Sequence, residues 1–538
     1  MITSSPTVVA IRVDASTRMG TGHVYRCLTL AAALARRGAE VHVIHRLHDG
    51  HMADVIRRAG HVVHTLPAPP HHTTLAIADG NYRAWAGVSE IEDADATRAV
   101  LCTIGAAWLI VDHYGFGQTW QQRLRTTVPH IMVIDDLADR THDCDILLDQ
   151  NWYARAESRY DDRVPPQCLR LCGPRFALIA PEYAAARPST APREGPVSRV
   201  LVFYGGSDEA GLTAQALRVL SQPAFLHLSV DVVVGRNAAD GHVVRQLAAA
   251  RGRTSVHDTL PSLLPLMLHA DLAIGAGGIT SWERCCVGLP ALVTVVAQNQ
   301  AAPSTALAVA GACLLVGALP GAGGNSADLS TALSTALQSL LDHPAQYAQI
   351  AQAAWDVGEG RGADIVAEVL LPSPHETLRL RDARMDDCRQ YWHWVNDPAV
   401  RDASIQDGVI DWPTHFAWFS RRLGVTDGAL CVLETAQGVP LGQFRVDVTN
   451  GRGIIDYSID RMFRGRGLGN ALIRRGVQAW IHRSPHMPLD ARVKRDNTAS
   501  AKAFLASGLF ELVVDISHDP RDVIDFTMCP QEVSACSP

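Results

Sequence analysis

Strand-type apolar runs alternate with helical patterns from the start of the chain. Residues 8–13 have the pattern of a buried strand, and residues 24–37 that of a helix which Gly38 closes at a C-cap position. Further short apolar runs follow at 41–45, 108–111 and 131–134, each before acidic or turn residues. Because parallel strands need crossover helices, this alternation predicts an α/β fold with a doubly wound parallel sheet.

Two polar breaks divide the chain. The first, at 187–194, contains Pro188 and Pro192, after which strand runs resume at 200–203, 230–234, 272–274 and 291–296. The second lies at 371–376, and beyond it Trp-rich helical sequence precedes strand runs at 429–434, 441–446 and 453–459. We therefore expect a first Rossmann-like lobe at 1–190, a second at 191–370 and an α+β domain at 376–530, in a chain too long for one core.

Composition excludes several classes of protein. The net charge of -7 comes from both signs scattered along 538 residues, without the basic arm of a nucleic-acid partner. A secretion signal and an uncharged run of about 18 apolar residues are both absent, so we expect a cytoplasmic protein without a membrane partner. The 12 cysteines include no C-x-x-C pair, which argues against structural zinc and for reduced thiols.

The first candidate site is the loop at 14–23, between the first strand and the first helix. Gly20 and Gly22 allow a ligand to approach the backbone, and His23 falls in the first helical turn. There the helix dipole disfavours imidazolium, so the ring stays neutral and can accept a proton. Asp14, at the end of the strand, is the expected partner that orients the ring. This loop opens where ligands bind in open α/β sheets.

The second candidate site combines two glycine-rich turns in the second lobe. One is Gly205-Gly206-Ser207-Asp208, and the other runs from Gly275 through Thr280 to Glu283 at the start of a helix. Backbone N–H groups in such turns suit phosphate oxygens, and Glu283 is placed to accept hydrogen bonds from ribose hydroxyls.

A family resemblance rests on these motifs together. The shared residues are Arg12-x-Asp14-Ala15-Ser16, Gly20-x-Gly22-His23-x-x-Arg26-Cys27, Val111-Asp112-His113-Tyr114, residues 134–140, the two glycine turns and Asn299-Gln300. Residues 8–369 thereby resemble the UDP-2,4-diacetamido-2,4,6-trideoxy-β-L-altropyranose hydrolases of pseudaminic acid biosynthesis. The resemblance implies a GT-B-like pair of lobes, His23 as the general base and UDP on the second lobe.

The resemblance also implies the members of the UDP-sugar site. We expect the diphosphate to meet Ser207, backbone N–H groups near Gly277 and Gly278, and Arg12, and the remaining contacts to come from Gly22, Asp112, Tyr114, Thr280, Glu283, Asn299 and Gln300. Gln298 stands where the family often has an acid. No metal is expected: Asp135 and Asp136 are assigned structural or sugar-hydroxyl hydrogen bonds, with metal binding as the alternative.

The third candidate site is the turn Arg464-Gly465-Arg466-Gly467-Leu468-Gly469, which joins a strand to a helix. Its amides and arginines suit a pyrophosphate. With Asn497 and Lys502 downstream, residues 378–528 resemble the GNAT acetyltransferase superfamily, and residues 394–401 and 415–419 resemble its nucleotide-amino-sugar N-acetyltransferases. This implies acetyl-CoA as co-substrate, bound by Arg464, Arg466, Gly467, Gly469, Asn497 and Lys502.

Two residues bear on the chemistry of this domain. Asp456, on the preceding strand, is the candidate general base that takes the amine proton through a water, aided by partial burial. Phe504 stands where many GNAT enzymes have the tyrosine that protonates the CoA thiolate, so that role passes to another residue or to water. Trp392, Trp394 and Trp418 are candidates for stacking on a base or sugar, or for the core.

Together these patterns predict a bifunctional enzyme of nonulosonic acid synthesis, which acetylates a UDP-amino-sugar and then hydrolyses off UDP. Two alternatives stay open. The front part could be a glycosyltransferase with the same nucleotide site, and the rear domain could acetylate a protein or peptide, or be degenerate.

Overall fold

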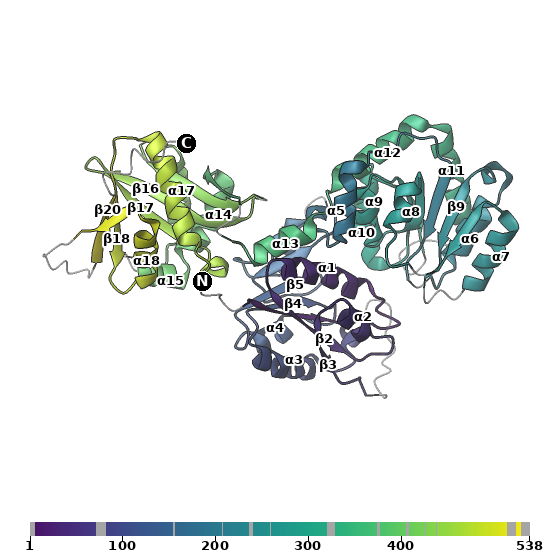
Figure 1. Ribbon diagram of the computed structural model, residues 1–538, viewed down its shortest axis with the longest axis horizontal. Helices are drawn as coiled ribbons and strands as arrows, with labels where there is room; N and C mark the ends of the chain where they lie inside the picture. Colours follow the sequence, from purple (N-terminus) through teal and green to yellow (C-terminus); the bar gives the residue numbers. More distant parts are fainter. Residues whose placement is uncertain are drawn as a thin grey trace. The chain divides into compact units, whose positions relative to one another are not determined.

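The computed structural model describes residues 6–70, 82–153, 156–206, 208–235, 240–258, 260–319, 329–373, 377–404, 408–425, 427–436, 438–513 and 523–528. The chain divides into two compact units, Met1–Val366 and Ala367–Pro538, called here the front and rear units (Figure 1). The front unit contains two sheets and the rear unit one.

The first sheet of the front unit is parallel, with the strand order β3-β2-β1-β4-β5-β6-β7. Helix α1 lies on one side of it and helices α3 and α4 lie on the other (Figure 1). Its strands are β1 Val8–Val13, β2 Glu40–Arg46, β3 Val62–Leu66, β4 Trp108–Asp112, β5 His130–Ile134, β6 Ile146–Asp149 and β7 Leu169–Cys172, and its helices are α1 Gly22–Arg36, α2 Ala53–Arg58, α3 Glu90–Ile104 and α4 Gln118–Leu124.

The strand order reverses between β1 and β4, which are hydrogen-bonded neighbours. At such a switch point, the crossover helices leave on opposite faces and open a crevice at the carboxyl ends of the strands. Helix α1, which follows β1, carries His23 in its first turn, and β4 ends at Asp112. The topology therefore brings together two residues that are 89 positions apart in sequence.

The second sheet repeats this arrangement with the order β10-β9-β8-β11-β12-β13, again all parallel. Its switch point lies between β8 and β11, the strands that precede the two glycine turns. The strands are β8 Arg199–Phe203, β9 Ser229–Val233, β10 Thr254–His257, β11 Leu272–Ala276, β12 Ala291–Val295 and β13 Leu314–Ala318. The helices from here to the end of the front sequence are α5 Pro181–Ala186, α6 Leu212–Leu220, α7 Gly241–Arg251, α8 Leu264–His269, α9 Thr280–Cys286, α10 Gln298–Val309, α11 Leu329–Asp342, α12 Pro344–Val357 and α13 Gly362–Leu370.

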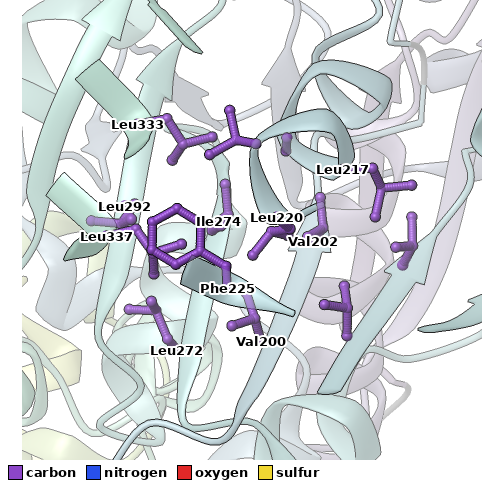
Figure 2. Packing of buried hydrophobic residues seen from close by; sticks show 14 of the residues in the cluster. Val200, Val202, Leu217, Leu220, Phe225, Leu272, Ile274, Leu292, Leu333 and Leu337 are labelled. Carbon is purple, nitrogen blue, oxygen red and sulfur yellow. The ribbon is translucent and has the colours of Figure 1, made fainter. Parts of the chain in front are cut away.

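One face of this second sheet is buried by aliphatic side chains from helices α6 and α11 (Figure 2). Val202 and Ile274 project from the two switch-point strands, and Leu217 and Leu333 cover them from the helices. Full burial of such a side chain contributes about 1.5–3 kcal/mol. This packing fixes β8 and β11, and with them the starting positions of the glycine turns.

The rear unit is α+β. Its sheet has the order β14-β15-β16-β17-β18-β20-β19, in which only the pair β17·β18 is parallel. The strands are β14 Leu378–Asp382, β15 Ala429–Thr435, β16 Pro440–Thr449, β17 Arg452–Ile459, β18 Leu489–Lys494, β19 Phe510–Leu512 and β20 Val523–Met528, and the helices are α14 Cys388–Val395, α15 Pro398–Ala403, α16 Trp412–Leu423, α17 Leu468–Arg483 and α18 Thr498–Ser507.

The parallel strands β17 and β18 separate part-way along. Their pairing ends at Ile455↔Ala491, although β17 continues to Ile459 and β18 to Lys494. Peptide groups beyond that point do not pair across the gap, so they can hydrogen-bond a ligand that enters there. The glycine turn at 464–469 follows β17 directly.

The predicted fold class is confirmed: two Rossmann-type lobes in a GT-B-like pair, followed by an α+β domain. Strands β3, β6 and β7, each only four or five residues long, are not among the strands predicted from the sequence. In the part of the chain that the structure describes, no helix is long and apolar enough to cross a membrane.

Candidate functional site

A cavity of about 230 Å³ lies in the front unit, between the two switch points. The first lobe contributes Met19, Gly22, His23, Arg26, Tyr114, Asp136, Gln150 and Asn151, and the second contributes Gly277, Gly278, Ile279, Trp282, Asn299, Gln300 and Pro303. The predicted histidine loop and the longer glycine turn thus share one cavity.

His23, in the first turn of α1, is held by Asp112. Its Nδ1 lies 2.6 Å from Asp112 Oδ1. Burial acts to raise the pKa of Asp112, but Arg26 and His23 hold that pKa well below its ordinary range. The carboxylate is therefore ionised and accepts the Nδ1 proton of the imidazole, which leaves Nε2 as the lone-pair nitrogen. This is the tautomer that a general base needs.

Arg26, one helical turn after His23, holds the Asp112 carboxylate in position. Its Nε lies 2.6 Å from Asp112 Oδ2 and its Nη2 lies 2.7 Å from Oδ1, while Nη1 donates to Asp136 Oδ2 at 2.8 Å. A bidentate pair of this kind is geometrically specific. Arg26 was not assigned a role from the sequence, although the i,i+3 spacing from His23 places both on one helix face.

The prediction that Asp14 orients His23 is wrong. Asp14 accepts two hydrogen bonds from Arg12, at 2.6 and 2.7 Å, and one from the Arg46 backbone N–H at 2.7 Å. Residues i and i+2 of a strand share a face, which puts Asp14 beside Arg12 and not beside the helix. Burial acts to raise the pKa of Asp14, and Arg12 nevertheless holds it well below its ordinary value.

The prediction that Arg12 meets the diphosphate is also wrong. Its guanidinium is fully buried and binds Asp14 on one edge and Asp93 on the other, with Nη2 2.7 Å from Asp93 Oδ2. The Nε, Nη1 and Nη2 atoms of Arg12 all donate to one of these two carboxylates. Arg12 therefore has a structural role within the first lobe.

Asp136 lines the cavity and accepts a hydrogen bond from Arg26, which also binds Asp112. It accepts hydrogen bonds from Tyr114 Oη at 2.5 Å and Asn151 Nδ2 at 2.8 Å. Asp135 faces away and accepts from the Ala138 backbone N–H at 2.8 Å. Asp136 therefore has the hydrogen-bonding role that was expected of it. No group of three potential metal-ligating residues occurs among the described residues.

Aromatic rings border His23. Tyr114 meets the imidazole edge-on with ring centroids 4.7 Å apart, and Trp85 meets it at 5.9 Å. Trp85 also stacks on Tyr114 at 5.2 Å. Trp85 lies in the short 3-10 helix Tyr82–Ala86 and carried no signal in the sequence that would have linked it to His23.

In the second lobe, some of the predicted residues line the cavity and others do not. Gly277, Gly278, Asn299 and Gln300 line the cavity, and Asn299 Nδ2 lies 3.4 Å from Tyr114 Oη. Thr280 and Glu283 are not among its lining residues, and Ser207 lies outside the described residues. Burial raises the pKa of Glu283 to about 7, against a hydrogen bond with Tyr183 that lowers it.

The turn predicted to bind CoA connects β17 to α17. Gly465 and Gly467 both have φ 76°, a left-handed conformation that favours glycine. Arg464 donates to the Ile459 carbonyl at 3.0 Å and to Asp397 at 2.8 Å, and Arg466 donates to the Leu370 carbonyl at 2.6 Å. Both arginines therefore hold the turn to its surroundings.

The partial burial expected of Asp456 is not observed, because its side chain is 51% exposed. It accepts from Gln443 Nε2 at 2.6 Å and lies 3.3 Å from Arg445 Nη2. Asn497 caps helix α18 by accepting the Ser500 backbone N–H at 3.1 Å, and Lys502 is exposed on that helix.

Phe504 is 2% exposed and packs between Phe510 and Phe526. The ring of Tyr457 meets Phe504 edge-on at 5.6 Å, and its hydroxyl accepts a hydrogen bond from Ser500 Oγ at 3.1 Å. Tyr457 also lies against Gly469, since a Cβ on that glycine would be 3.7 Å from the hydroxyl. A phenol hydroxyl thus lies beside both the glycine turn and the start of α18.

The tryptophans of the rear unit support its helices. Trp394 is buried and donates to Asp460 at 2.8 Å, and Trp392 donates to the Ile410 carbonyl at 2.7 Å. Trp418 lies under the Arg445 guanidinium, 5.3 Å from the ring centroid. Trp392 and Trp394 therefore belong to the packing of this unit.

Comparison with known proteins gives a family match within the rear unit and sequence relatives of part of the chain. Residues 377–509 match the family model described as the acetyltransferase (GNAT) domain. Over 146 residues the chain is 30% identical to the spore coat polysaccharide biosynthesis protein SpsG of Bacillus subtilis (strain 168), covering 27% of this chain and 43% of that protein. Over 126 residues it is 32% identical to the UDP-2,4-diacetamido-2,4,6-trideoxy-beta-L-altropyranose hydrolase of Campylobacter jejuni, covering 23% of this chain and 43% of that protein.

Among solved structures, MurG of Acinetobacter baumannii is similar with a TM-score of 0.47 and 14% identity, covering 68% of this chain and 99% of that one. The chain spans less than half the length of the two sequence relatives. It is thus similar to sugar-biosynthesis proteins over part of its sequence, and it carries a GNAT acetyltransferase domain.

Proposed function

We propose that the front unit is a nucleotide-sugar hydrolase that releases UDP from a UDP-2,4-diacetamido-2,4,6-trideoxyhexose, with the β-L-altro isomer as the expected substrate. The observation that carries this proposal is the His23–Asp112 pair, whose imidazole faces a cavity that also receives a glycine turn suited to a diphosphate. The similarity to the Campylobacter jejuni hydrolase supports the choice of sugar.

In the proposed reaction, His23 Nε2 takes a proton from a water molecule while the water oxygen attacks the anomeric carbon. The bond from that carbon to the diphosphate oxygen breaks, and its electron pair leaves on UDP. Asp112 stabilises the imidazolium that forms. Gly277 and Gly278 face the expected position of the diphosphate, and Asn299, Gln300 and Asp136 offer polar groups to uridine and sugar.

We propose that the rear unit transfers an acetyl group from acetyl-CoA to the amine of the precursor UDP-amino-sugar. The amine nitrogen attacks the thioester carbonyl, the carbon–sulfur bond breaks, and the thiolate leaves as CoA. Asp456 takes the amine proton through a water, because its half-exposed carboxylate is within reach of solvent. The GNAT domain match and the open strands β17 and β18 support this assignment.

The two reactions follow in a defined order, because the diacetamido product of the rear unit is the substrate of the front unit. The test is mass spectrometry of products formed by the full chain from UDP-4-amino-sugar and acetyl-CoA. We expect CoA, UDP and free diacetamido sugar. His23→Ala should stop the reaction at the acetylated UDP-sugar, while the exposed control His227→Ala should leave it complete.

Two results would overturn the proposal. UDP release that requires an added sugar or lipid acceptor would make the front unit a glycosyltransferase. Acetylation of a peptide amine with none of the amino sugar would assign the rear unit a different substrate.

A further inference from the structure

Arg284 is buried directly behind the longer glycine turn of the second lobe. It lies on α9, is 4% exposed, and its Nη2 donates to the Ala276 carbonyl at 3.0 Å and to Ser281 Oγ at 2.9 Å. A Cβ built on Gly275 would lie 3.2 Å from Nη1. The guanidinium is therefore separated from the cavity by the thickness of the turn itself, since Gly277 and Gly278 line that cavity.

This guanidinium lacks a counter-charge. Within the described residues, no carboxylate lies within 4 Å of it, and its Nε makes no hydrogen bond although it is buried. The contrast with the first lobe is sharp, because Arg12 and Arg26 each bind two carboxylates. Glu283 is the adjacent carboxyl in sequence, and burial raises its pKa to about 7, which reduces the charge it supplies near neutral pH.

A second polar group at the same turn is also unsatisfied. Ser304, on α10, is 3% exposed, and its Oγ has no hydrogen-bond partner among the described residues. The Oγ lies only 2.1 Å from the position that a Cβ on Gly277 would take, so it lies directly against the turn. Buried polar groups without partners are rare in folded proteins, and two of them lie behind this one glycine turn.

An uncompensated buried cation destabilises a protein unless something pairs with it. Here the open side of the turn is the cavity, and an anion bound there would lie across one peptide layer from the guanidinium. At such a distance two charges still interact appreciably in a partly buried site. A neutral ligand such as a nucleoside would gain nothing from this charge.

We propose that Arg284 is a positioning residue for the anionic part of the ligand: it stabilises a nucleoside diphosphate in the cavity by its charge, and it fixes the turn by holding the Ala276 carbonyl. The inference rests on the proposed UDP site of the front unit. It assigns the selectivity for a diphosphate over an uncharged nucleoside to a residue that does not line the cavity.

The test is calorimetric titration of UDP and uridine into the full chain and into Arg284→Met. We expect the substitution to weaken UDP binding about tenfold or more and to change uridine binding less than twofold. Arg284→Lys keeps the charge and should recover much of the UDP affinity. The matched control is Arg193→Met, because Arg193 also donates to backbone carbonyls of this lobe, those of Met267 and Val287, away from the turn.

Thermal unfolding supplies a second readout. Arg284→Met removes a buried charge and also the hydrogen bonds to the Ala276 carbonyl and Ser281, so each variant is compared with its own ligand-free Tm. The rise in Tm that UDP produces should be smaller in Arg284→Met than in the wild type. Equal weakening of UDP and uridine would show a purely structural role, and unchanged UDP affinity would likewise overturn the proposal. Failure of the wild type to bind UDP would instead refute the proposed function of the front unit.

Discussion

His23 Nδ1 and Asp112 Oδ1 are 2.6 Å apart, and they meet because β1, which precedes the helix of His23, lies beside β4, which ends at Asp112. The histidine follows one strand and the aspartate ends the other. Their pairing is thus a consequence of the topology, and it converts a histidine at a helix start into a base with a defined tautomer.

Replacing Asp112 should impair proton transfer without abolishing substrate binding. In Asp112→Asn the imidazolium loses its counter-charge, so we expect UDP release to slow by about 10²-fold or more, the range of general base catalysis, with a much smaller change in KM. The acidic limb of the pH–rate profile should also move to lower pH. Steady-state assays of UDP release between pH 5 and 9 measure both effects.

The control for this substitution is Asp161→Asn, which removes an exposed carboxylate paired with Arg170 in the same lobe. It should leave the rate and the profile unchanged. A loss of activity in Asp112→Asn with an unshifted acidic limb would show that Asp112 only maintains the fold of the site.

Tyr457 is the residue that we expect to protonate the departing CoA thiolate in place of Phe504. Burial raises the pKa of Tyr457, so its hydroxyl keeps its proton through the neutral range. Tyr457→Phe should lower kcat for acetyl transfer by about 10²-fold or more with little change in CoA affinity, as expected for the loss of a proton donor. Steady-state CoA release and CoA titration separate these quantities.

The chain offers a reciprocal variant for this prediction. Phe504→Tyr places a phenol at the position that many GNAT enzymes use, so it should restore part of the rate when combined with Tyr457→Phe. Tyr391→Phe is the control, because that buried hydroxyl donates to the Cys431 carbonyl away from the turn. An unchanged rate in Tyr457→Phe would assign the proton to water.

Sequence reasoning found the loops of both sites but not the partners within them. The glycine turns and His23 were predictable, because glycine conformation and helix-start chemistry are local properties. Proximity in sequence favours Asp14 as the partner of His23. Asp112 is brought to His23 because β4 lies beside β1 in the sheet. Arg12 looked free for a phosphate because its two carboxylates, Asp14 and Asp93, meet it only in the folded lobe.

Long-range packing also explains which features of the rear unit could not be predicted from the sequence. Phe504, on helix α18, indicates that the usual tyrosine acid is missing, but the hydroxyl of Tyr457 comes from strand β17 and meets α18 only in the folded domain. The exposure of Asp456 likewise depends on which side chains pack against β17, and sequence periodicity does not predict those contacts.

Glu283 should make the stability of the front unit depend on pH. Burial raises its pKa in the folded state from 4.5 to about 7, so the folded protein holds this proton more tightly than the unfolded chain does. The resulting stabilisation is complete below about pH 4.5 and is lost as the pH rises through 7, with a magnitude of about 3 kcal/mol. Glu283→Gln cannot ionise, so its stability relative to the wild type should increase between pH 5 and 8. Urea unfolding of both proteins across this range measures the difference. The control Glu209→Gln removes an exposed carboxylate of the same lobe and should follow the wild-type curve, because an exposed group has little difference between its folded and unfolded states. Parallel curves for Glu283→Gln and the wild type would show that Glu283 ionises in the folded protein as it does in the unfolded chain.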